Sequence, residues 1–307
     1  ISGAHAMAAS VLKMPVIAVA SRSQEKSTER ANQLNAKSVE YSQLPSGADI
    51  VIVATPPAQH FDHAVYSLQR GAAVIIEKPL AYTLNEADRL VSHAEQNGQK
   101  MLYAENLAYA PIVHAFIKRA ASIGSVTHMS FRTVQSLPAW GDFTTAEWGG
   151  GALFDLGIYP VSFASMVLGT PSRITARSTK AFTGVDGQTS IILEYPSGAQ
   201  ALLNTTNLAA TPNQALIIGS DARIEIDRTF YNPTTWRVIN YKDEIVAGSD
   251  KKYVGHGLRE EAIEFARCFR AGEKESPMLP LDETLSIMGT ITEIANQIGL
   301  KFEKFAQ

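Results

Sequence analysis

The sequence predicts an α/β protein in which a doubly wound parallel sheet is followed by an α+β domain with an open, mainly antiparallel sheet. Two observations carry this prediction. Short apolar runs alternate with helix-forming segments up to about residue 106. Beyond that point, strand-like segments follow one another with few helices between them. The 307 residues fit two domains of roughly 150 residues each, and we place the boundary between residues 1–106 and 107–307.

Strands and helices alternate in the first part of the chain. The strands are expected at residues 14–20, 50–54, 72–76 and 100–105, and the helices at 23–35, 59–70 and 83–98. The runs at 50–54 and 72–76 are apolar throughout, which is typical of strands buried on both faces of a parallel sheet. Thr83 and Glu86 have the spacing of a capping box. Because ligands of such sheets bind at the carboxyl ends of the strands, the polar residues after each strand are the candidates for a site.

The second part of the chain is dominated by predicted strands. They are expected at residues 126–135, 173–180, 189–195, 199–205, 215–218 and 223–226, with two closing helices at 257–271 and 281–298. Pro196, Ser197 and Gly198 form a hairpin-type turn, which favours antiparallel pairing. The closing helices are candidates to pack back on the first domain.

Composition and charge argue against several classes of protein. The net charge is -3 and no stretch is densely basic, so neither nucleic acid nor an anionic membrane is an expected partner. No apolar run approaches the roughly 20 residues that a membrane span needs. The single cysteine, Cys268, excludes an internal disulfide, fits a reducing cytoplasm and is expected to be a core residue. The seven histidines lack ligand-like spacing, so no metal site is expected.

Ser21 and Arg22 follow the first predicted strand, where a dinucleotide-binding fold meets the adenosine ribose. A carboxylate there would favour NAD, and the sequence has none at this point. A hydroxyl and a guanidinium suit a 2′-phosphate, so NADP is the expected cofactor and NAD the alternative. An arginine taken alone is more often a solvated surface residue, but its place after a buried strand favours the site.

The segment after the second predicted strand offers further cofactor contacts. Thr55 can hydrogen-bond a ribose or phosphate oxygen, and Pro56 holds the backbone extended. Gln59 and His60 begin the next predicted helix and are also expected to contact the cofactor. A rigid strand-to-helix connection, with His60 as a capping or core residue, explains the same pattern equally well.

Glu77, Lys78 and Pro79 follow the third predicted strand. An ammonium group at this point can bind ribose hydroxyls, polarise a substrate oxygen and lower the pKa of a nearby phenol. Glu77 is also a candidate for cofactor binding, and the Lys78–Pro79 peptide bond is of the kind that can be cis. A lysine–proline turn is common on protein surfaces, so it is the position at a strand end that indicates a site.

Residues 148–160 form a glycine-rich segment that contains the remaining candidate chemistry. Glycines at 149–151 allow close backbone approach to a ligand. Asp155 and Tyr159 are four residues apart and share one face of a helix, so a carboxylate can hold a substrate hydroxyl while a phenol exchanges a proton. Pro160 disfavours helical geometry at Tyr159, so a helix is expected to start or kink there. The alternative is a glycine loop before a core helix.

These motifs together resemble the Gfo/Idh/MocA oxidoreductase family over essentially the whole chain. The motifs are Ala54-Thr55-Pro56, Glu77-Lys78-Pro79, the run from Gly149 to Tyr159, and Ser276-Pro277-Met278-Leu279-Pro280-Leu281. Within the family, the chain is similar to the branch of dimeric dihydrodiol dehydrogenase and NADP-dependent D-xylose dehydrogenase. The resemblance implies that Lys78 is the active-site lysine, that Asp155 binds substrate, and that Tyr159 stands where the inositol dehydrogenase branch has histidine.

The resemblance implies a Rossmann-type dinucleotide-binding domain in residues 1–106 and a substrate-binding and oligomerisation domain in 107–307. It implies hydride transfer between NADP(H) and a small hydroxylated substrate, which is a sugar, polyol or trans-diol. Tyr159 is expected to exchange the proton, with Lys78 lowering its pKa and Asp155 holding a substrate hydroxyl. A homodimer or larger homo-oligomer is expected, because the second sheet has few helices to cover it. The residues expected to supply its apolar surface are Ile191, Leu193, Leu203 and Ile218.

The family pattern begins with a strand and a Gly-x-Gly-x-x-Gly/Ala loop, whereas Ile1-Ser2-Gly3-Ala4-His5 is similar to the residues just after those glycines. The first strand of the parallel sheet is therefore expected to be missing from this sequence. Two other functions stay open. One is a non-catalytic dinucleotide or sugar sensor, against which Lys78, Asp155 and Tyr159 argue. The other is a biliverdin-reductase-like activity on a larger conjugated substrate.

Overall fold

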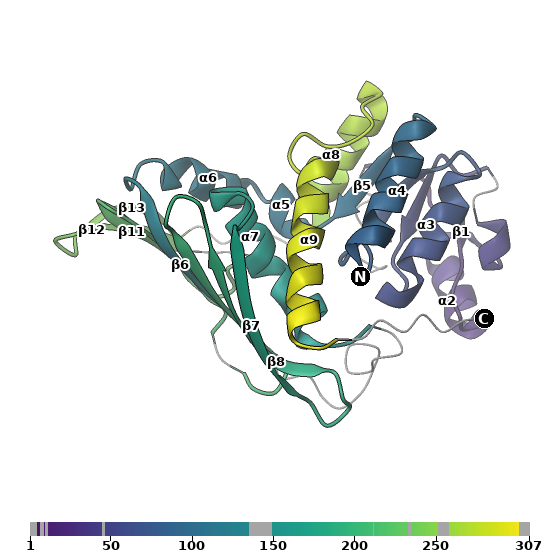
Figure 1. Ribbon diagram of the computed structural model, residues 1–307. Helices are drawn as coiled ribbons and strands as arrows, with labels where there is room; N and C mark the ends of the chain where they lie inside the picture. Colours follow the sequence, from purple (N-terminus) through teal and green to yellow (C-terminus); the bar gives the residue numbers. More distant parts are fainter. Residues whose placement is uncertain are drawn as a thin grey trace.

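The computed structural model describes residues 5–6, 9, 12–44, 47–134, 149–210, 212–232, 235–250 and 258–300. The chain forms a part built on parallel strands and a part built on a large, mainly antiparallel sheet, and this confirms the predicted fold class (Figure 1). None of the described helices is long and apolar enough to cross a membrane.

The parallel strands lie in two separate sheets. One consists of β3 (Ile50–Val53), β4 (Ala73–Glu77) and β5 (Met101–Ala104), and the other of β1 (Ala18–Val19) and β2 (Lys37–Ser38). The helices of this part include α2 (Gln24–Leu34), α3 (His60–Leu68) and α4 (Leu84–Gln96). Every residue of β4 and β5 is buried, which confirms the expectation for the run at 72–76. The same expectation is wrong for the run at 50–54, because β3 is an edge strand of its sheet and its Ile52 is 37% exposed. Thr83 caps α4 by accepting a hydrogen bond from the Glu86 N–H at 3.2 Å.

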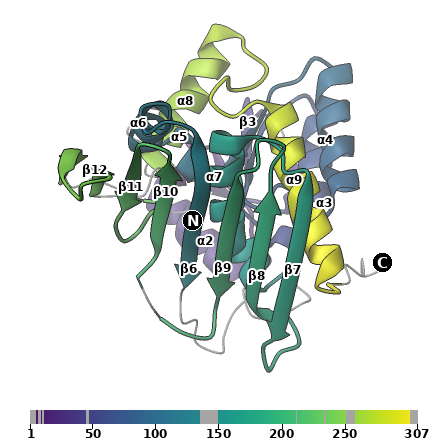
Figure 2. The same ribbon diagram turned by 60° about the vertical axis from the view of Figure 1, so that its left-hand side comes forward.

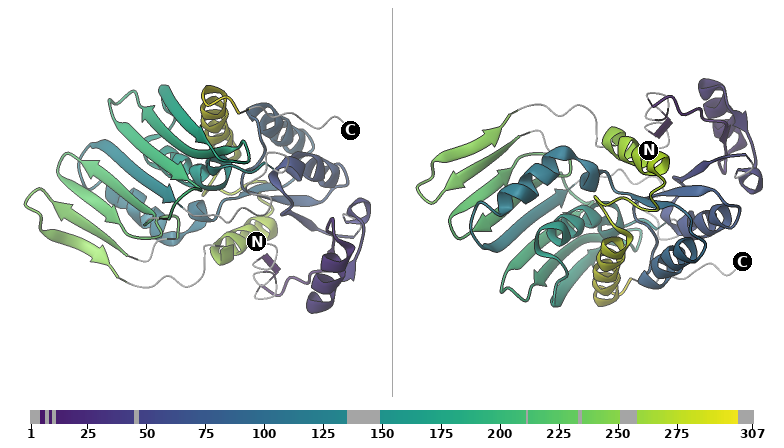
Figure 3. Two further views of the ribbon diagram at one scale, coloured as in Figure 1. Left: turned by 90° about the horizontal axis from the view of Figure 1, so that it is seen from below. Right: turned by 90° about the horizontal axis from the view of Figure 1, so that it is seen from above.

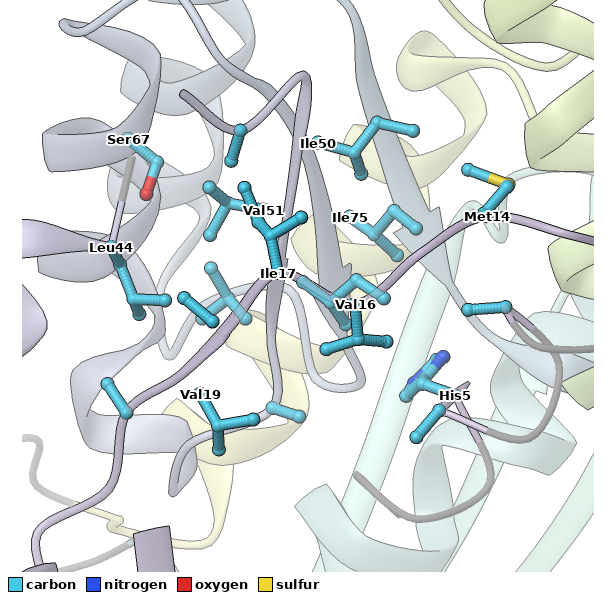
Figure 4. A pocket seen from close by; sticks show the side chains of 18 of the residues that line it. His5, Met14, Val16, Ile17, Val19, Leu44, Ile50, Val51, Ser67 and Ile75 are labelled. Atoms are coloured by element: carbon cyan, nitrogen blue, oxygen red, sulfur yellow. The ribbon is translucent and has the colours of Figure 1, made fainter. Parts of the chain in front are cut away.

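A cavity of about 1100 Å³ separates the two parallel sheets. Apolar side chains line it from the β1 side, at Ile17 and Val19, and from β3, at Ile50 and Val51 (Figure 4). In a doubly wound sheet with strand order 3-2-1-4-5-6, the first strand lies between the second and the fourth. β1 and β3 correspond to those two positions, so the cavity occupies the place between them in this strand order.

The second sheet has eight strands in the order β13-β12-β11-β10-β6-β9-β8-β7. They are β6 (Val126–Val134), β7 (Arg173–Lys180), β8 (Asp186–Glu194), β9 (Gln200–Thr206), β10 (Gln214–Gly219), β11 (Ala222–Ile226), β12 (Trp236–Asn240) and β13 (Ile245–Ser249). All neighbours pair antiparallel except β6 and β9, which are parallel. The strands β12 and β13 were not predicted from the sequence, and neither were the helices α5 (Asn106–Tyr109) and α6 (Pro111–Ala120).

Helices cover one face of the second sheet. α7 (Ile158–Leu168) packs on β6, and α9 (Leu281–Gln297) packs on β7 (Figure 1). α9 also contacts α4, where the Leu84 N–H donates to Thr292 Oγ1 at 2.9 Å, and α8 (Leu258–Ala271) packs on α5. Seen from below and above, α8 and α9 stand between the large sheet and the parallel strands (Figure 3). The closing helices thus join the two parts of the molecule.

The opposite face of the second sheet carries no helix of the described chain, as Figure 2 shows for β6, β7, β8 and β9. The apolar side chains on this face include Ile192 and Leu202, each 39% exposed and paired with each other in register. Ile191, Leu193 and Leu203 point the other way and are at most 2% exposed. Their expected contribution to an oligomer surface is therefore wrong, because alternation along β8 and β9 turns them toward α7 and α9.

Candidate active site

Lys78 reaches from the end of β4 to the glycine-rich segment. Its Nζ donates to the carbonyl oxygen of Asp155 at 2.8 Å and to Oδ1 of the same residue at 2.9 Å. The two side chains are 12% and 13% exposed, so water screens the pair only weakly. The Lys78–Pro79 peptide bond is cis. The fold thus joins a strand end and a helix start that lie 77 residues apart in the sequence.

Asp155 and Tyr159 lie on consecutive helical turns, and the first of these is π-helical. The turn Leu153–Gly157 runs directly into α7, whose third residue is Pro160. In a π-helix the carbonyl of residue i accepts from the N–H of residue i+5. For Asp155 that residue is Pro160, which has no N–H, so the carbonyl is available to the Lys78 ammonium. The helix does not start at Pro160; it contains Pro160 behind a π-helical turn.

The three predicted catalytic side chains meet at this point, since Lys78 Nζ lies 5.2 Å from the centroid of the Tyr159 ring. Burial raises the pKa of Tyr159, and the Lys78 charge offsets only part of that rise. Burial lowers the pKa of Lys78, but the charges of Asp155 and Tyr159 outweigh it and the pKa rises. At neutral pH the phenol therefore keeps its proton and the lysine its charge, which differs from the lowered phenol pKa expected from the sequence.

A second tyrosine, which was not predicted from the sequence, forms one wall of the site. The Tyr231 ring stacks on the Tyr159 ring with centroids 4.4 Å apart and planes 12° from parallel. Asn213 Nδ2 donates to the Tyr231 hydroxyl at 3.2 Å. Burial raises the pKa of Tyr231, and Asp155 adds to the rise. Tyr231 lies between β11 and β12 in a segment without a motif, so no sequence signal could have found it.

Glu105 is a buried acid whose carboxyl interacts with the charge of Lys78. Burial raises the pKa of Glu105 to about 8, against smaller opposing effects of the Ser162 hydroxyl and Lys78. Glu105 is fully buried just after β5, the strand next to β4, and Lys78 is the residue that follows β4. This carboxyl is therefore neutral over much of the range below pH 8.

Glu77 lies beside a histidine, and its predicted contact with a cofactor stays a prediction. His5 Nε2 lies 2.6 Å from Glu77 Oε1, and His5 Nδ1 lies 3.8 Å from Glu261 Oε1. The Lys78 backbone N–H also donates to Glu77 Oε2, at 3.2 Å. Among the described residues, this trio has ligand-type atoms within 4.8 Å of one another. The two ring nitrogens face different carboxylates, so the imidazole bridges the acids, and the expectation of no metal site stays a prediction.

Four predicted cofactor residues line one cavity. Ser21 and Arg22 follow β1, and Thr55 and Pro56 follow β3, at the carboxyl ends of two strands. Lys26, in the first turn of α2, lines the same cavity, and its backbone N–H donates to the N-cap hydroxyl, Ser23 Oγ, at 3.2 Å. A hydroxyl and two cations near a helix N-terminus suit an anionic group. The residues present therefore fit the phosphorylated ribose of a dinucleotide.

His60 and Gln59 differ from the rest of the predicted cofactor set. His60 is 1% exposed, and its nitrogens lie 2.7 Å from the carbonyl oxygens of Pro79 and Thr55. Both ring nitrogens are thus occupied by backbone, and His60 ties the loop after β3 to the loop after β4. This arrangement fits the core-histidine alternative, and a contact of His60 with the cofactor stays a prediction. Gln59 closes a short 3₁₀ turn, Pro57–Gln59, and its contact with a cofactor stays a prediction.

Comparisons with known families match both parts of the chain. Residues 3–105 match a family model described as an oxidoreductase family with an NAD-binding Rossmann fold. Residues 117–225 match the GFO/IDH/MocA C-terminal domain.

Individual relatives cover nearly the whole chain. Trans-1,2-dihydrobenzene-1,2-diol dehydrogenase of Xenopus laevis is 31% identical over 94% of this chain and 91% of its own length. D-xylose 1-dehydrogenase (NADP(+)) of Hypocrea jecorina is 29% identical over 94% of this chain and 84% of its own length. A 3-ketoreductase of Actinomadura kijaniata, solved with NADP and TDP-benzene, has a TM-score of 0.86 at 22% identity, over 96% of this chain and 93% of its own.

Proposed function

This chain belongs to the GFO/IDH/MocA oxidoreductase family, and from that premise we propose that it transfers a hydride between NADP(H) and a sugar, polyol or trans-diol. The relatives named as a diol dehydrogenase and a D-xylose dehydrogenase support this substrate class. The observation that carries the proposal is the meeting of Lys78, Asp155 and Tyr159 at the end of β4. A protein that only senses a ligand has no need of a proton-transfer set.

Ser21 and Arg22 are the proposed partners of the cofactor's 2′-phosphate, through a hydroxyl and a charge-assisted hydrogen bond. Thr55 and Pro56, which line the same cavity, support the cofactor along the strand ends. When bound, NADP(H) supplies or accepts the hydride at its nicotinamide ring.

Tyr159 Oη is the proposed proton donor to the substrate oxygen in the reductive direction. Its raised pKa keeps the phenol protonated at neutral pH, which suits a donor. Lys78 then stabilises the phenolate that remains, because its ammonium lies beside the ring. Asp155 uses one carboxylate oxygen for Lys78 and offers the other to a substrate hydroxyl. In the oxidative direction the same proton moves from the substrate hydroxyl to the phenolate.

A second assignment gives the proton to Lys78 and leaves Tyr159 to position the substrate. The ion pair argues against it, because Asp155 raises the pKa of Lys78 and engages the ammonium through both its backbone carbonyl and its carboxylate. A lysine held in this way loses its proton less readily than one in water.

The proposal is tested with a panel of aldoses, polyols and trans-diols, followed through the absorbance of NADPH. Turnover of one or more substrates with NADP(H), and slower turnover with NAD(H), is the expected result. NADPH binding measured by fluorescence, without turnover on the whole panel, would instead support the sensor alternative. Turnover confined to a large conjugated substrate would support the biliverdin-reductase-like activity.

The assembly is proposed to be a homodimer or larger, built on the uncovered face of the second sheet. Ile192 and Leu202 form an exposed apolar cross-strand pair there, which supports an interface. We also propose a dinucleotide-binding domain up to residue 106, a substrate-binding domain beyond it, and a cytoplasmic location. The single cysteine, which is buried, fits the last of these.

A further inference from the structure

Asp186 lies beneath the turn that carries Asp155, and the proposed chemistry does not use it. This aspartate is the first residue of β8 and is 1% exposed. Its Oδ2 accepts from the Leu153 N–H at 2.7 Å and from Thr189 Oγ1 at 3.2 Å. Leu153 is the first residue of the π-helical turn. The carboxylate of Asp186 therefore takes the place of an N-cap that the local sequence does not supply.

The need for such a cap follows from burial. The first N–H groups of a helix have no partner inside it, and Leu153 is 0% exposed, so water cannot serve its N–H. Ala152, the residue before Leu153, is held by a side chain of the neighbouring strand β9, because Thr205 Oγ1 donates a hydrogen bond to the Ala152 carbonyl oxygen at 3.0 Å. Two side chains of the second sheet thus fix the backbone two and three residues before Asp155.

The glycine run is fitted to the same carboxylate. A Cβ atom on Gly151 would lie 2.0 Å from Asp186 Oδ1, and the Gly151 φ of +133° is one that other residues rarely adopt. The close approach of the Gly151 backbone is therefore made to Asp186, whereas the sequence pattern alone pointed to a ligand.

We propose that Asp186 is a positioning residue for the proposed reaction, whose carboxylate fixes the start of the Asp155–Tyr159 helix and so sets both side chains against Lys78. The inference rests on the proposed function. None of the hydrogen bonds described for Asp186 reaches Lys78, Asp155 or Tyr159, so it acts through the Leu153 backbone. A shift of about 1 Å in catalytic groups can cost about 10²-fold in rate.

The protonation of Asp186 matters, since a charged acceptor makes a stronger hydrogen bond than a neutral one. Burial raises the pKa of Asp186 to about 7, and the hydrogen bonds from Leu153 and Thr189 oppose the rise. The group is thus ionised above about pH 7 and neutral below it, so the positioning weakens in acid. The charged side chains on the elements packed against it are Lys180, Arg177 and Arg173 of β7, Glu194 of β8 itself, and Asp155; β9 has none.

The experiment compares wild type with Asp186→Ala and Asp186→Asn. The control on the same strand is Glu194→Gln, because Glu194 lies at the far end of β8 and forms a surface ion pair with Arg173. We expect kcat to fall about 10²-fold in Asp186→Ala and less in Asp186→Asn, which keeps an acceptor oxygen. The NADPH dissociation constant of every variant, and the kcat of Glu194→Gln, should stay near wild type. In the reductive direction Tyr159 stays protonated throughout the neutral range, so there the acid limb of kcat near pH 7 should be present in wild type and absent from Asp186→Asn.

A second readout does not depend on turnover. Hydrogen exchange of residues 149–157 should be faster in Asp186→Ala and Asp186→Asn than in wild type, with Glu194→Gln unchanged. Wild-type kcat with an unchanged acid limb in Asp186→Asn would overturn the positioning role, and so would unchanged exchange in folded variants. If wild type turns over nothing on the panel, the proposed function fails, and the exchange data alone then decide whether Asp186 caps the turn.

Discussion

Tyr159→Phe removes one hydroxyl from the site and keeps the ring that stacks on Tyr231 at 4.4 Å. The Lys78–Asp155 ion pair does not involve that hydroxyl, so the rest of the site should hold its geometry. The loss is then that of general acid–base catalysis, about 10²- to 10⁴-fold. The lower bound corresponds to about 2.7 kcal/mol of transition-state stabilisation. Affinity for NADPH should change little.

The assay is steady-state turnover followed through NADPH absorbance, with NADPH affinity measured separately by fluorescence. Tyr231→Phe is the matched control, because it removes a phenolic hydroxyl from the partner ring, where Asn213 binds it, and should cost far less. In wild type the oxidative rate should rise with pH through the neutral range, since burial raises the pKa of Tyr159 above the ordinary value of about 10. Near-normal turnover of Tyr159→Phe would refute this reasoning and move the proton role to Lys78.

Three further changes test other parts of the structure. Arg22→Ala should weaken NADP more than NAD, by about 1 to 3 kcal/mol in titration calorimetry if a charge-assisted hydrogen bond is lost; equal losses for both cofactors would contradict the 2′-phosphate assignment. Leu202→Asp places a charge on the uncovered sheet face and should convert the proposed oligomer to a monomer in light scattering. Ile263→Asp, at an exposed site on α8, should leave the mass unchanged, and an unchanged mass for Leu202→Asp would contradict the proposed interface. Burial raises the pKa of Glu105 from its ordinary value of 4.5 to about 8 in the folded protein. Between these two pH values the folded state keeps a proton that the unfolded state releases. The free energy of unfolding of wild type should therefore fall as pH rises from about 4.5 to about 8. Glu105→Gln should remove this loss. In urea unfolding, the difference in stability between pH 5 and pH 8 should then be smaller for the variant than for wild type. An equal difference in both proteins would argue against a neutral buried Glu105.

The sequence by itself determined the strands that hold the site. The apolar runs before Thr55 and Lys78 are typical of strands in a parallel sheet, and ligands meet such sheets at their carboxyl ends. The spacing of Asp155 and Tyr159 was by itself enough to place them on one face of a helix. These are local properties, since each depends on residues within one element and on its repeat.

Tertiary structure decided which residues meet across elements and which faces are covered. A strand period of two shows that Ile191 and Leu193 share a face, but only the packing of α7 and α9 shows that this face is the buried one. Asp186 meets the Leu153 N–H across 33 residues, and Tyr231 meets Tyr159 from another loop. Such contacts follow from the relative placement of elements, which is set by the burial of whole surfaces rather than by any short sequence pattern.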